Sequence, residues 1–133
     1  MPDSIGRIFS LQEADALIPM LSGITANIVQ KLDAVRERYR QDAQSEALEV
    51  PEQIMRDIEE ALKDWSDAIL EFGGHPKGYF TVDFQSFDPE LLYCWTYGEE
   101  KIAYTHKVWE NFAHRRPLSE SLRGVVDHMR WLH

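Results

Sequence analysis

The chain has 133 residues, of which 44% are hydrophobic and 28% charged, and this balance is typical of one water-soluble domain, here residues 1–133. A formal net charge of −9 argues against a nucleic-acid partner, because the field of the molecule repels phosphate backbones. No stretch approaches the roughly 20 apolar residues that cross a bilayer, and the single cysteine has no partner for an intramolecular disulfide. We therefore expect a cytoplasmic protein with no membrane partner.

The first half of the chain carries the pattern of two long helices. Ser10 and Glu13 have the spacing of a capping box, and apolar residues then recur every three or four positions into the low forties. Pro19 predicts a bend in the second turn of this helix. A second helix should begin after Pro51 and end at Gly73-Gly74. Together they predict an antiparallel helical hairpin over residues 10–73.

Each of these helices has an apolar face wider than one partner helix can cover. The uncovered part should meet the sheet or a second subunit. Our leading functional hypothesis is therefore a non-enzymatic interaction module, which forms a homodimer by pairing the long helices into a four-helix bundle.

Beyond the glycines the hydrophobic period changes from 3.6 to 2, which indicates β-strands. Strands at 79–85, 91–97 and 101–107 predict a three-stranded antiparallel meander over residues 79–107. A loop and a short C-terminal helix, from Leu118 to Leu132, are expected within residues 108–133. The predicted fold class is α+β.

The sequence Gly98-Glu99 suggests a type II′ turn, with glycine first, between the last two strands. Such a turn fixes which residues lie opposite each other: Trp95 and Ile102, Tyr93 and Tyr104, Leu91 and His106. His106 then shares a face with the aromatic side chains, whereas Asp83 and Cys94 lie on the other face. In this register the polar residues do not converge within one subunit.

Two kinds of site compete with the dimer hypothesis, and whether the protein is an enzyme is left open. One is a small-molecule pocket between the sheet and the helices, with these candidate ligand-binding residues: Tyr93, Trp95, Tyr104, His106 and Arg115. The other is a divalent-metal site that needs a different register or a second chain, with these candidate ligands: His106, Glu99, Asp83 and Cys94. A phosphate or nucleotide site at Arg115-Arg116 is our third hypothesis, after the dimer and after these two kinds of site.

Each candidate residue also has a purely structural explanation. His106 could be a core-edge histidine with both ring nitrogens hydrogen-bonded, and Cys94 a small half-buried side chain. Glu99 could serve only the turn. Asp83 could pair with Arg115 or its neighbour.

Four segments resemble a small bacterial family, the domain of unknown function family 2203: FSLQEADALIPML, VDF, CWTYGE and RRPL. The match spans nearly residues 8–118 and departs from the family pattern at Asp15, Thr105 and Asn111, where the family has asparagine, tryptophan and glycine. The resemblance implies a cytoplasmic protein with a helical hairpin and a small sheet, and it brings no known activity. It marks these motif positions: Asp83, Cys94, Trp95, Glu99, His106 and Arg115.

Overall fold

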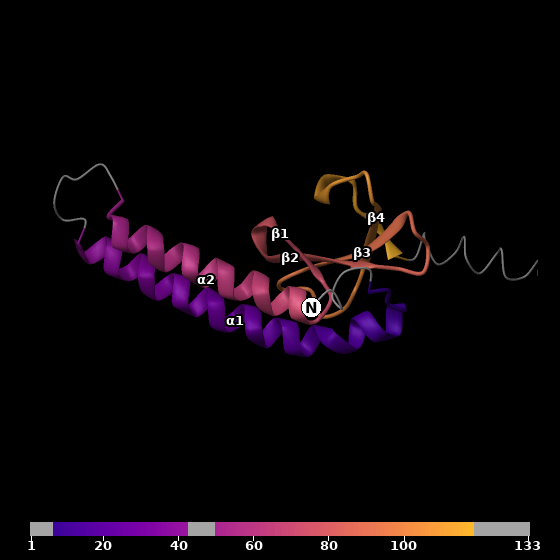
Figure 1. Ribbon diagram of the computed structural model, residues 1–133, viewed down its shortest axis with the longest axis horizontal. Coiled ribbons are helices and arrows are strands. Elements are labelled where there is room, and N and C mark those ends of the chain that lie inside the picture. The colour runs from indigo at the N-terminus through magenta and orange to yellow at the C-terminus, as the bar shows by residue number, and fades with distance from the viewer. Residues whose placement is uncertain (1–6, 43–49, 119–133) are drawn as a thin grey trace, which may run out of the picture.

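The computed structural model describes residues 7–42 and 50–118. This part of the chain forms a helical hairpin of α1 (Leu11–Asp42) and α2 (Glu52–Glu71), with a five-stranded antiparallel sheet packed against one end (Figure 1). The expected α+β class and the helical hairpin are confirmed. Neither helix is apolar enough over a sufficient length to cross a membrane.

The helix ends form where the sequence predicts them. The Ser10 hydroxyl accepts from the backbone N–H of Glu13 at 3.0 Å, and the Glu13 carboxylate accepts from that of Ser10 at 2.9 Å, which completes the capping box. Gly73 follows α2 with φ of +89°, the left-handed conformation that ends helices. Figure 1 shows the first turns of α1 turned toward the sheet. Pro19 lies inside this helix.

Polar bonds join the layers. The Trp65 indole of α2 donates to the Thr25 hydroxyl of α1 at 2.9 Å, so the helices are linked inside the core. The backbone N–H of Ile102 donates to Asp15 Oδ1 at 2.7 Å, which ties the sheet to α1. The asparagine that the resemblance led us to expect at this position could accept in the same way through its side-chain oxygen.

The sheet has two more strands than the predicted meander. Its order follows the chain: β1 (His75–Lys77), β2 (Thr81–Gln85), β3 (Leu91–Thr96), β4 (Tyr104–Lys107) and β5 (Arg116–Pro117). The two edge strands were not predicted, because each is very short and contains a proline, Pro76 or Pro117, which masks any alternating pattern. Proline is tolerated at sheet edges, where its missing N–H leaves no ladder bond unmade.

Strand β2 begins at Thr81 rather than at Tyr79. Tyr79 and Phe80 lie in a short 3₁₀ segment, η2 (Gly78–Phe80), and both have positive φ, of 58° and 55°. The alternation that suggested a strand is therefore interrupted by a turn of the backbone, although Phe80 still packs against the core.

The predicted registers are wrong by different amounts. Between β2 and β3 the offset is two residues, with Phe84 opposite Tyr93 and Val82 opposite Trp95, so the apolar side chains remain on the core face. Between β3 and β4 the offset is one residue, with Leu92 opposite His106. An odd offset transfers every side chain of a strand to the other face. His106 is consequently on the face opposite the core.

The cause of this odd offset is the turn after β3. The backbone N–H of Glu99 donates to the carbonyl of Thr96 at 3.0 Å, so Tyr97 and Gly98 are the central residues. Gly98 has φ of +105° in the second central position, not the first, and the predicted type II′ turn is incorrect. The chain continues to Tyr104 before pairing again. The predicted C-terminal helix lies beyond Leu118, outside the described residues.

Candidate functional site

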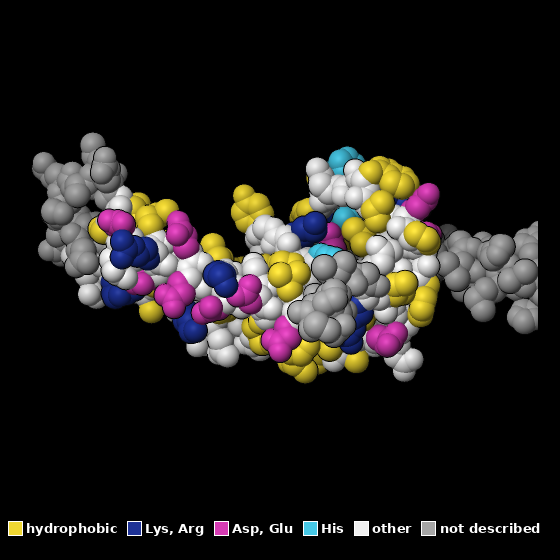
Figure 2. All heavy atoms as spheres, viewed as in Figure 1, with side chains coloured by type: hydrophobic (Ala, Val, Ile, Leu, Met, Phe, Trp, Pro, Cys, Tyr) yellow, Lys and Arg dark blue, Asp and Glu magenta, His cyan; other side chains and the backbone are white. Residues whose placement is uncertain are grey.

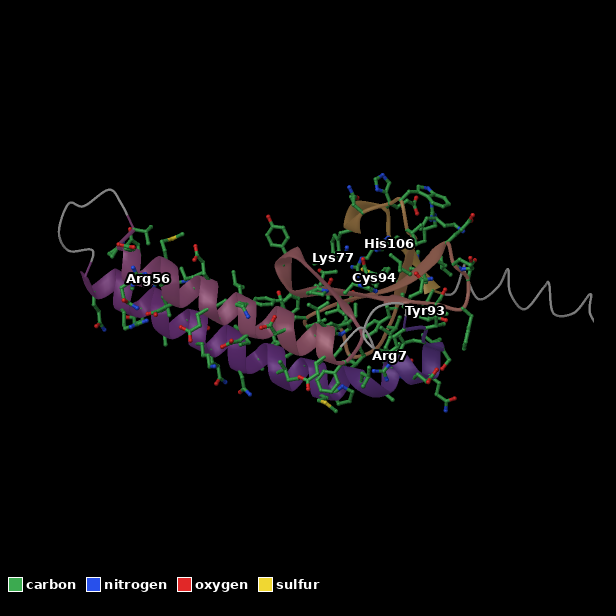
Figure 3. The ribbon with its side chains drawn as sticks, viewed as in Figure 1. Arg7, Arg56, Lys77, Tyr93, Cys94 and His106 are labelled. Atoms are coloured by element: carbon green, nitrogen blue, oxygen red, sulfur yellow. The ribbon has the colours of Figure 1, made fainter. Side chains whose placement is uncertain are left out.

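Three of the four predicted metal ligands meet on the face of the sheet that points away from the helices. Asp83 of β2 lies directly opposite Cys94 of β3, and His106 of β4 lies two residues further along the same face. Their ligand atoms all fall within 4.8 Å of one another. The three residues are 2%, 0% and 4% exposed, so the cluster is withdrawn from solvent. Figure 3 shows Cys94 and His106 together above the strands.

The surroundings of His106 decide where its protons are. Its Nδ1 lies 2.8 Å from the backbone carbonyl of Lys107, which can only accept, so this nitrogen carries a hydrogen. Its Nε2 lies 3.0 Å from Asp83 Oδ1, and this contact also needs a proton between the two atoms. The ring is thereby fixed with Nε2 directed at the cluster. A histidine whose Nδ1 is held by a carbonyl has the usual orientation of a metal ligand.

Cys94 is not arranged as a nucleophile. Burial, reinforced by the Asp83 carboxylate, raises the pKa of its thiol to about 12, against the opposing effect of Arg115. The thiol is therefore protonated at neutral pH. His106 is not placed to act as its base in a Cys-His-Asp triad, because the Asp83 carboxylate lies at Nε2 and the Lys107 carbonyl at Nδ1.

Glu99, the fourth predicted ligand, belongs to a different contact. Its carboxylate accepts from the backbone N–H of Thr96 at 2.7 Å and from Arg115 Nη1 at 3.2 Å to each oxygen. The guanidinium carbon of Arg115 lies 4.0 Å from the ring centroid of Tyr104 and 4.1 Å from that of Phe112. Arg115 also reaches the edge of the cluster, since its Nη1 is 4.0 Å from Cys94 Sγ.

The aromatic residues predicted to bind a ligand are divided between the two faces of the sheet. Trp95 is fully buried in the core, where its indole donates to the carbonyl of Glu99 at 2.7 Å, and Tyr93 packs against the same core. Burial raises the pKa of the Tyr93 hydroxyl. Tyr104 and His106 belong to the opposite face. These side chains therefore do not line one common pocket between the sheet and the helices.

A cleft of about 630 Å³ opens above the cluster. Asp83, Cys94 and His106 form part of its lining, residues 77–79 contribute one wall, and residues 108 and 110–113 contribute to another. Figure 2 shows this face hollowed between two projecting groups of hydrophobic side chains, with acidic, basic and histidine side chains between them. Sequence reasoning missed Lys77 and Tyr79 as site residues. The Pro-Lys-Gly-Tyr order around them was the available signal, since it marks a break before the strand.

Comparison with known proteins identifies a family for this chain. The sequence model of the family described as "Uncharacterized conserved protein (DUF2203)" matches residues 7–118. Neither the curated proteins nor the solved structures provide a match.

Proposed function

The chain belongs to the DUF2203 family of uncharacterized conserved proteins, and we propose that it binds a divalent metal ion of the zinc class through Asp83, Cys94 and His106. The observation that carries this proposal is the convergence, within 4.8 Å, of a carboxylate, a thiol and an oriented imidazole in a buried cluster at a cleft. The proposal needs no second chain, because all three residues come from neighbouring strands.

The donor set selects the metal. Thiolate and imidazole favour zinc and its transition-metal neighbours over magnesium or calcium, which prefer oxygen ligands. Tetrahedral zinc with its usual bond lengths requires ligand atoms roughly 3.3–3.8 Å apart. The 3.0 Å between His106 Nε2 and Asp83 Oδ1, and the 4.8 Å limit for the whole set, leave only small side-chain movements to make.

Charge also supports a divalent ion. The Asp83 carboxylate and the Cys94 thiolate together balance two positive charges, and Glu99 separately neutralises Arg115 beside them. Three protein ligands leave the fourth tetrahedral position for water or a ligand from the cleft, as in zinc sites that act on small molecules. An ion there would supply a Lewis acid to a bound oxygen atom.

Metal content tests this proposal directly. Untagged protein, purified without chelators, is expected to contain close to one zinc-class ion per chain by elemental analysis. After exchange to Co²⁺ it should show a thiolate-to-cobalt charge-transfer band that Cys94→Ala abolishes. His106→Gln should lower metal affinity by about 100-fold or more, whereas His114→Gln, at an exposed histidine of the cleft wall's 3₁₀ segment, should not. Trace metal in the folded wild-type protein would refute the proposal.

We infer, as a second candidate function, that the helical hairpin associates with a second copy of itself. Three large apolar side chains of α2 remain exposed, Met55 by 43%, Leu62 by 41% and Leu70 by 41%. Each of them directly follows a buried residue of α2, namely Ile54, Ala61 or Ile69. The three exposed side chains therefore form a stripe beside the seam between the helices. Figure 1 shows the far half of the hairpin, where α2 begins, projecting beyond the sheet, so the sheet does not cover the helices there.

Solution mass tests the self-association. Light scattering at micromolar concentration is expected to give twice the 15.5 kDa of one chain. Leu62→Glu should halve that mass without unfolding the protein, because the side chain is already partly exposed. The control Gln30→Glu adds the same charge at an exposed polar position of α1 and should leave the mass unchanged. A monomeric wild-type protein would eliminate this function.

A further inference from the structure

The titratable side chains of the cleft leave one positive charge without a counter-charge. Glu110 is neutralised by Arg116, whose two terminal nitrogens lie 2.9 and 2.8 Å from its oxygens, and this pairing holds the pKa of the carboxyl at about 2. Asp83 is paired with His106. Lys77 is exposed and makes no ion pair with any other residue in the described ranges 7–42 and 50–118.

This surplus follows from how the charged side chains are paired. Asp83 faces His106, and Glu110 faces Arg116, so both carboxylates of the cleft lie against another partner. Lys77 therefore supplies the unpaired positive charge of the cleft, although the chain as a whole carries a formal charge of −9. Figure 3 shows Lys77 beside Cys94 and His106. The cleft therefore favours a ligand with a negative charge.

A strained backbone presents an aromatic ring at the same wall. Tyr79 and Phe80 both have left-handed φ angles, which are costly for residues other than glycine. Phe80 is held in place by the Trp65 ring, at 5.1 Å between centroids and 84° between planes, and by the bond from the N–H of Tyr97 to its carbonyl at 3.0 Å. The consequence is that Tyr79 stands 98% exposed at the cleft.

Apolar side chains also line the cleft from the loop after β4. Val108 and Phe112 are 46% and 50% exposed there. A cleft of about 630 Å³ is the size of sites that enclose small organic molecules. Aromatic walls favour a flat, apolar body, because rings stack face to face with an offset or edge to face.

We propose that the cleft binds a small planar monocarboxylate, with its carboxylate drawn to Lys77 and the Asp83–Cys94–His106 cluster and its apolar body against Tyr79, Val108 and Phe112. This inference rests on the proposed metal function for the ligand's second anchor, the open position on the ion. Lys77 and Tyr79 are independent of the metal ligands, so the two proposals fail separately.

Calorimetric titration with two shape-matched probes, 2-naphthoate and 2-naphthalenemethanol, tests the inference on zinc-loaded and on chelated protein. The zinc-loaded wild type should bind the carboxylate at least tenfold more tightly than the alcohol. Lys77→Gln should remove most of that preference, whereas Lys31→Gln, at an exposed lysine of α1 remote from the cleft lining, should not. Equal affinity for the two probes, or an unchanged preference in Lys77→Gln, would overturn the inference.

Tyr79→Asn separates binding from structure. Asparagine adopts left-handed φ more readily than tyrosine, so the melting temperature should stay the same or rise. The affinity for both probes should nevertheless fall at least fivefold, because the ring is lost; unchanged affinity would count against the apolar contact.

Zinc binding without naphthoate binding would leave the metal function standing and remove this inference. Lys77-dependent naphthoate binding to protein that takes up no metal would support this inference and remove the metal function.

Discussion

Replacing Arg115 with lysine is expected to lower the free energy of unfolding by roughly 2 kcal/mol, and the melting temperature by roughly 5–10 °C. The arginine side chain is only 14% exposed and lies between two aromatic rings while it bonds both oxygens of Glu99. An ammonium group keeps the charge but has neither the flat surface that stacks on the rings nor the reach of a guanidinium. Thermal and urea denaturation measure the loss.

The adjacent arginine provides a matched control. Arg116 also bonds a carboxylate through two nitrogens, but its side chain is 47% exposed. Exposed ion pairs contribute about 0–1 kcal/mol, so Arg116→Lys should have a small effect. Equal losses in the two variants would mean that the stacking of Arg115 does not matter and that any change in this segment is costly.

The helices and the faces that they bury could be predicted, because each depends on a pattern within a short stretch of the sequence. The capping box at Ser10 and the stop at Gly73 fix the helix ends, and the repeat of three and four residues fixes the faces that pack. The prediction of which side chains of β2 and β3 face the core was also correct. The predicted register between these strands was off by two residues, but an even offset keeps every side chain on its face.

The position of His106 could not be predicted in this way. It depends on whether the connection between β3 and β4 shifts the register by an even or an odd number of residues, and a single glycine with positive φ does not determine that. The sequence named Asp83, Cys94 and His106 as possible ligands only if the register differed or a second chain took part, and the structure has a different register. Glu99 was grouped with them by proximity in the chain, but it bonds Arg115 instead.

Tyr79 illustrates a second limit. Alternating residue types made it look like the start of a strand, because no sequence pattern announces that a tyrosine will adopt a left-handed conformation. One expected departure from the family pattern has a local explanation. At Asn111, where the resemblance led us to expect glycine, the side chain accepts from the N–H of Ala113 at 3.0 Å and caps the 3₁₀ segment η3 (Phe112–His114).

The affinity for zinc is expected to rise at least 100-fold between pH 6 and pH 8. The pKa of the Cys94 thiol is raised to about 12, so the metal-free protein keeps this proton across the whole interval. Zinc binds the thiolate and must displace the proton, and a lower pH therefore opposes binding by about tenfold per unit.

Competition with a metal buffer, repeated at each pH, measures this dependence. In Cys94→Ala the slope of log affinity against pH should fall by one, because the proton that zinc displaces from the thiol is gone. Melting curves of the metal-free protein at each pH separate a change in affinity from a change in folding. If the wild type and Cys94→Ala give the same slope, the thiolate is not a ligand, and the ion would be held by His106 and Asp83 alone.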